Sequence, residues 1–126
     1  MNISASLLFT LLTISCSSTS SSDAQLFQES VKLHEESLII ADSVEAKLSK
    51  LSVMSHDSVD LLLHDLALWR TDLIEVPGHK HNHIHHHTHG HTPVNVTPSE
   101  MLDIQKDLRQ RIENIKIRCE ALTAKK

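Results

Sequence analysis

Apolar residues recur at intervals of three, four and seven along the chain after residue 22, with charged residues between them. From Asp23 to about Lys50 the recurring positions are Phe27, Val31, His34, Leu38, Ala41, Leu48 and Leu51. Because an α-helix has 3.6 residues per turn, this spacing places the side chains on one face. The pattern predicts an amphipathic helix over residues 23–50.

A second stretch of the same spacing is the clearest in the chain. Ser52, Ser55 and Asp57 are candidate N-caps for it. They precede an unbroken alternation of three and four: Val59, Leu62, Leu66, Trp69, Leu73 and Val76. We expect this helix to end at Val76-Pro77-Gly78, because proline and glycine prevent its continuation.

The third helix has the strongest start signal. Thr97 is placed as its N-cap, Pro98 as its first residue, and Glu100 closes a capping box. The apolar positions that follow form a heptad seam: Met101, Leu108, Ile115 and Leu122, with Gln105, Ile112 and Cys119 between them. This pattern is typical of coiled-coil packing.

Size and composition favour a single helical domain. The chain has 126 residues, 2% aromatic residues, two glycines and three prolines, too few turn residues for a fold built from many short strands. Each helix alone would be marginal in water. We therefore predict an all-α fold, a three-helix antiparallel bundle running up, down and up, with coiled-coil-like seams. Pairing with another copy, as a homo-oligomer, or with a helical protein partner would extend this packing.

The N-terminal region is typical of an export signal. Residues 1–22 carry no charge, and the apolar run between Ile3 and Ile14 is too short to span a bilayer. Ser15-Cys16, followed by serines, resembles a lipobox, which predicts a signal peptide over 1–15, a lipid on Cys16, a serine-rich tether over 16–22 and a helical domain over 23–126. Thr13, where leucine is usual, and the lack of an early basic residue depart from that pattern. Ordinary secretion and a retained helix are the alternatives.

The chain has two cysteines, Cys16 and Cys119. If Cys16 is acylated, Cys119 has no partner and is expected to be a small buried apolar thiol in the third helix. A disulfide between the two is the alternative.

A histidine-rich loop is predicted between the second and third helices, over residues 77–97. It is longer than an antiparallel connection needs. Eight of the thirteen residues from 79 to 91 are histidines: His79, His81, His83, His85, His86, His87, His89 and His91. Imidazole binds Zn(II), Ni(II) and Cu(II), and so many overlapping ligand sets predict several sites of low selectivity. Protons compete for the same nitrogens near pH 6.5, so mild acid should release the metal.

The alternative interpretation of this loop is a low-complexity insertion that binds metal only incidentally, as an affinity tag does. An added tag is not favoured, because the run is internal, interrupted and flanked by helix-boundary signals. The net charge of −4 with neutral histidines makes nucleic acid an unfavourable partner at neutral pH.

Other histidines and Cys119 are weaker candidates. His34 lies on the apolar stripe of the first helix and is expected to be a hydrogen-bonded core histidine rather than a haem or metal ligand. His56 and His64 are expected on solvated faces, and Trp69 in the core. No C-x-x-C-H motif is present, which excludes covalent haem attachment. Nothing near Cys119 suggests an oxyanion hole, so we predict no enzyme activity.

The layout resembles small Bacteroidetes-type lipoproteins that are often labelled viral A-type inclusion proteins. The matching features are a short leader ending at Cys16, the segment Val31-Lys32-Leu33-His34-Glu35-Glu36, a second helix closing around Trp69-Arg70, a variable loop and a charged third helix. The resemblance implies a membrane-tethered helical protein of the cell envelope, facing the periplasm or the outer surface. The predicted function is non-catalytic binding of divalent Zn, Ni or Cu through the loop. The alternative is a structural or partner-binding coiled-coil lipoprotein whose histidines are incidental.

Overall fold

The computed structural model describes residues 19–52, 57–79 and 94–124. These residues form three helices: α1 (Thr19–Ser52), α2 (Asp57–Thr71) and α3 (Pro98–Thr123). They contain no strand, which confirms the all-α prediction for this part of the chain. None of the described helices combines the length and apolar character needed to cross a membrane. Cys16, His56 and the run from His81 to His91 lie outside the described residues.

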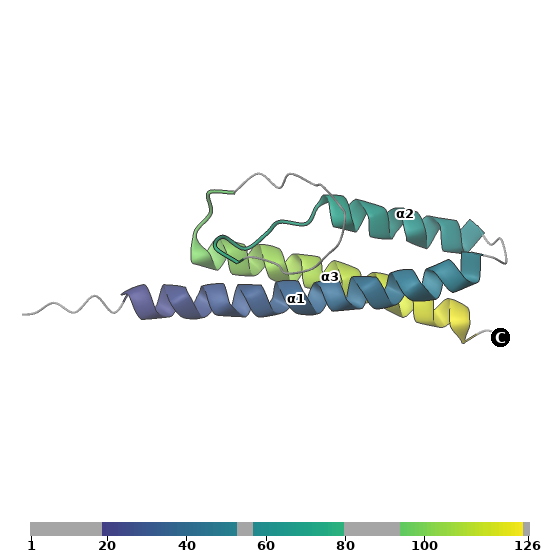
Figure 1. Ribbon diagram of the computed structural model, residues 1–126, viewed down its shortest axis with the longest axis horizontal. Helices are drawn as coiled ribbons and strands as arrows, with labels where there is room; N and C mark the ends of the chain where they lie inside the picture. Colours follow the sequence, from purple (N-terminus) through teal and green to yellow (C-terminus); the bar gives the residue numbers. More distant parts are fainter. Residues whose placement is uncertain (1–18, 53–56, 80–93, 125–126) are drawn as a thin grey trace, which may run out of the picture.

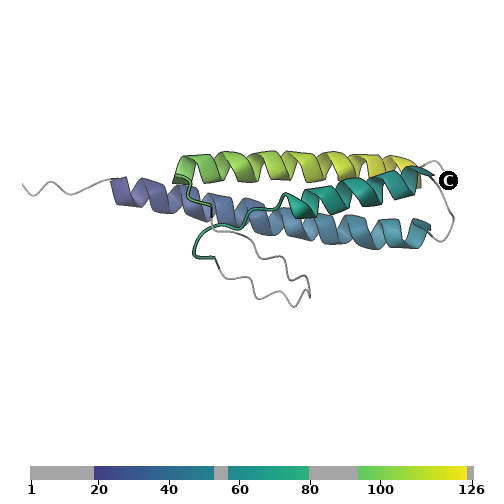
Figure 2. The ribbon, with the colours of Figure 1, turned by 90° about the horizontal axis from the view of Figure 1, so that it is seen from above.

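The three helices pack along one another (Figures 1 and 2). The most extensive packing joins α1 and α3, which run in the same direction, while α2 runs the opposite way. Two hydrogen bonds between charged side chains, Arg109 to Glu36 and Lys47 to Glu120, both join residues 73 apart in sequence. A constant separation is what two parallel neighbouring helices produce.

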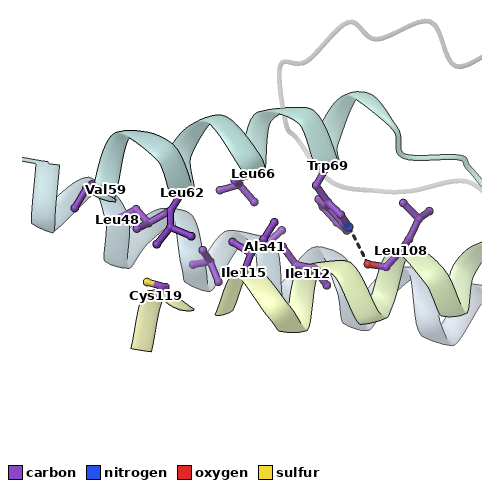
Figure 3. Close-up of a cluster of buried hydrophobic side chains, with 11 residues drawn as sticks. Ala41, Leu48, Val59, Leu62, Leu66, Trp69, Leu108, Ile112, Ile115 and Cys119 are labelled. Atoms are coloured by element: carbon purple, nitrogen blue, oxygen red, sulfur yellow. Dashed lines mark hydrogen bonds between the residues drawn. The ribbon is translucent and has the colours of Figure 1, made fainter. Parts of the chain in front are cut away.

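The hydrophobic core is built from one face of each helix (Figure 3). Its buried members are Ala41, Val44 and Leu48 of α1, Val59, Leu62, Leu66 and Trp69 of α2, and Leu108, Ile112, Ile115 and Cys119 of α3. Trp69 is fully buried, and its indole Nε1 donates a hydrogen bond to the carbonyl of Leu108 at 2.8 Å. The predicted burial of these α2 and α3 positions is confirmed.

The first helix differs from the prediction in its start and in its buried face. α1 begins at Thr19, four residues before Asp23, so the last part of the predicted serine-rich tether is helical. Serine costs only a few tenths of a kcal/mol in a helix, and this end of α1 extends past the start of α3 (Figure 2). The buried face of α1 carries Ser30, His34 and Ser37, while Phe27 and Leu38 are half-buried.

The second helix ends earlier than predicted. α2 stops at Thr71, and residues 73–76 are not helical. Val76 is nevertheless buried, so the apolar spacing predicted its burial correctly and its conformation wrongly. The side-chain amide of Gln105 donates to the carbonyl of Ile74 at 2.7 Å. This tertiary hydrogen bond satisfies a backbone group that a continued helix would have satisfied locally.

The third helix begins as predicted. The Thr97 hydroxyl accepts a hydrogen bond from the backbone N–H of Glu100, and the Glu100 carboxylate accepts one from the backbone N–H of Thr97 at 2.7 Å. This hydrogen bond from the Thr97 backbone lowers the pKa of the Glu100 carboxyl below 4.5. The capping box therefore fixes the residue at which the chain re-enters the helical domain.

Candidate functional site at the base of the histidine run

His79 is the first of the eight histidines predicted to bind metal, and it lies within the described residues. The other seven, His81, His83, His85, His86, His87, His89 and His91, lie outside them, as does the predicted lipidation site Cys16. The structure therefore describes the point at which the histidine run leaves the helices.

A tight turn presents His79 to the surface. The backbone N–H of His79 donates to the carbonyl of Val76 at 3.1 Å, and Gly78 has a φ of +79°. Proline in the second position of the turn and glycine with positive φ in the third define a type II turn. A Cβ on Gly78 would meet no atom within 4 Å, so the backbone conformation is what requires glycine here.

The imidazole of His79 lies against helix α1. Its Nε2 is 3.1 Å from Oε1 of Glu35, and the two side chains are 24% and 48% exposed. The imidazole is thus held by the helix and remains accessible from solvent. Nothing in the local sequence around either residue predicts this contact, because the two positions belong to separate elements.

A buried group of polar atoms, which we call the polar node, lies among the same elements. It comprises the side chains of His34 and Gln105 and the carbonyl of Ile74. The Gln105 amide nitrogen donates to Ile74, so its carbonyl oxygen Oε1 faces Nδ1 of His34 at 3.2 Å. Because Oε1 only accepts hydrogen bonds, His34 carries a proton on Nδ1. The prediction that His34 is a hydrogen-bonded core histidine is confirmed.

Two buried serines flank His34 on the same face of α1. The hydroxyl of Ser30 donates to the carbonyl of Leu26 at 2.8 Å, and that of Ser37 donates to Leu33 at 2.6 Å. Each hydroxyl is therefore satisfied within its own helix. The burial of these serines could have been predicted from their spacing. Positions 30, 34 and 37 continue the alternating intervals of four and three that Ala41, Val44 and Leu48 follow.

The remaining candidates show no comparable arrangement. His64 is exposed on α2. Among the described residues, no three His, Cys, Asp or Glu side chains lie close enough to hold a metal ion together. Cys119 is a buried free thiol, as predicted, and burial raises its pKa. A buried, protonated thiol is a poor nucleophile.

Several apolar side chains are exposed, a feature that the helical pattern did not predict. Leu61 and Leu68 of α2 and Ile117 of α3 are 61%, 49% and 60% exposed. Leu61 also lines an open groove of about 260 Å³ between the start of α2 and the end of α3. Its lining residues are Ser58, Leu61, Leu62, Arg118, Ala121 and Leu122.

Comparison of the chain with protein-family models, with curated proteins and with solved structures gives no match.

Proposed function

We propose that this protein is a non-catalytic cell-envelope lipoprotein that binds divalent Zn, Ni or Cu. The ligands would be His79, His81, His83, His85, His86, His87, His89 and His91. The observation that carries the proposal is that this run of imidazoles begins on a side chain which Glu35 holds at the surface of α1. The run thus starts from a defined point on the helices, unlike a terminal affinity tag.

The chemistry of the run supports capture and release. Neutral imidazole donates a nitrogen lone pair to borderline metals, and binding should follow the order Cu(II) above Ni(II) and Zn(II). As the pH falls through about 6.5, protons occupy these nitrogens and displace the metal. Binding should therefore be strongest at neutral or mildly alkaline pH and decline in mild acid.

Attachment to a membrane through a lipid on Cys16 belongs to the same proposal. It rests on the lipobox-like order around Cys16 and on the resemblance to Bacteroidetes-type envelope lipoproteins. α1 begins at Thr19, three residues after Cys16. Glu35 lies 16 residues further along this helix (35 minus 19), or about 24 Å at 1.5 Å per residue. A lipid on Cys16 would thus keep the metal-binding run within a few nanometres of the membrane surface.

The domain that carries the run is proposed to be an up-down-up antiparallel bundle with coiled-coil-like seams. Its support is the alternating spacing of four and three in the buried positions of the two longest helices. These are Ser30, His34, Ser37, Ala41, Val44 and Leu48 in α1, and Met101, Gln105, Leu108, Ile112, Ile115 and Cys119 in α3. Such seams suit knobs-into-holes packing.

A second candidate function is partner binding by a structural lipoprotein whose histidines are incidental. The exposed side chains of Leu61 and Leu68 favour it, because they lie seven residues apart on one face of α2 and an apolar face can receive another helix or a second copy. This function predicts concentration-dependent association in sedimentation equilibrium, abolished by Leu61→Ser with Leu68→Ser. This function would be refuted if the protein stayed monomeric at all concentrations and captured no partner.

Calorimetric titration tests the metal proposal. The full chain in detergent would be titrated with Zn(II), Ni(II) and Cu(II) beside a matched variant in which all eight histidines are asparagine. We expect defined stoichiometry, nanomolar affinity and loss of binding in the variant and in mild acid. Affinity no tighter than that of a free peptide spanning residues 79–91 would refute the proposal.

A second experiment tests the lipid on Cys16. It measures incorporation of radiolabelled palmitate into the protein, with Cys16→Ser as the control.

A further inference from the structure

We draw no further inference here: the strongest candidate, the exposed face of α2 that carries Leu61 and Leu68 together with the groove that Leu61 lines between α2 and α3, carries nothing beyond the partner binding already proposed, because nothing in the described part of the structure shows what covers it.

Discussion

The two ends of the helical domain are held by different interactions. Around Trp69, where α2 packs against α1 and α3, the buried side chains are apolar, and the buried indole of Trp69 donates a hydrogen bond to α3. Towards the start of α3, the non-helical segment before His79 follows the end of α2 (Figure 1). There the buried side chains include Ser30, His34, Ser37 and Gln105. We call these regions the apolar end and the polar end.

The difference shows which interactions fix the alignment of the helices. An apolar seam with a repeat of seven tolerates a shift by one repeat, because each position then meets a similar neighbour. The pair formed by His34 and Gln105 does not tolerate it, since a shift would break the buried hydrogen bond between these two side chains. The apolar end therefore supplies most of the burial, and the polar end sets the register and anchors the base of the histidine run.

Removal of Trp69 should have the largest effect. Trp69→Ala takes away the largest fully buried side chain and its hydrogen bond to Leu108. Large-to-small substitutions of buried aromatic residues cost about 3–5 kcal/mol. We expect a loss of this size in the free energy of unfolding by urea, followed by circular dichroism at 222 nm. Leu68→Ala, at an exposed position of the same helix, should cost far less, and equal losses would contradict the assignment of Trp69 to the core.

Substitution of Gln105 should come next. Gln105→Leu removes the side-chain amide that hydrogen-bonds the Ile74 carbonyl and Nδ1 of His34, which should cost about 1–3 kcal/mol. The matched control is Gln110→Leu, at an exposed position of α3, with an expected change within about 0.5 kcal/mol. In a double-mutant cycle with His34→Leu, the two losses should not add. Additive losses would show that the pair does not couple.

A smaller effect is expected at Gly78, where the positive φ disfavours a side chain. Gly78→Ala should lower the free energy of unfolding by about 1–2 kcal/mol. The loss is conformational, because the added Cβ meets no atom. Gly78→Asn should cost less, since asparagine adopts this conformation more readily. Equal stabilities of the glycine and alanine proteins in urea unfolding would contradict the described turn.

The smallest effect concerns pH and the capping box. The pKa of Glu100 is lowered below 4.5 in the folded protein, so its ionised form favours folding above the unfolded pKa. This contribution is lost as the pH falls through the folded pKa. Thermal melting of wild type and Glu100→Gln from pH 7 to pH 3 should show a small advantage for wild type that disappears in acid. An advantage that grows in acid would reverse the sign of the pKa shift.

Local signals were sufficient to predict some of these features and not others. Thr97, Pro98 and Glu100 act within one helical turn, so the start of α3 is readable from the sequence. Val76 was expected to be buried and is, but the Ile74 carbonyl in the non-helical segment after α2 is hydrogen-bonded by Gln105, 31 residues away. His34 was predicted to be satisfied in the core, yet its partner lies 71 residues away. The chemistry of the histidine run follows from its composition, whereas the support that Glu35 gives His79 requires the folded chain.

The turn before His79 and the capping box at Thr97 bear on how many imidazoles the segment between them can carry. Each end of the intervening segment is fixed by its own local hydrogen bonds. The free energy of closing a loop rises only with the logarithm of its length, by about 0.6 kcal/mol for each doubling. Imidazoles can therefore be added to or removed from this segment at little thermodynamic cost to the helices. Under the proposed metal-binding function, the number of ions bound per chain would then be adjustable independently of the helical domain.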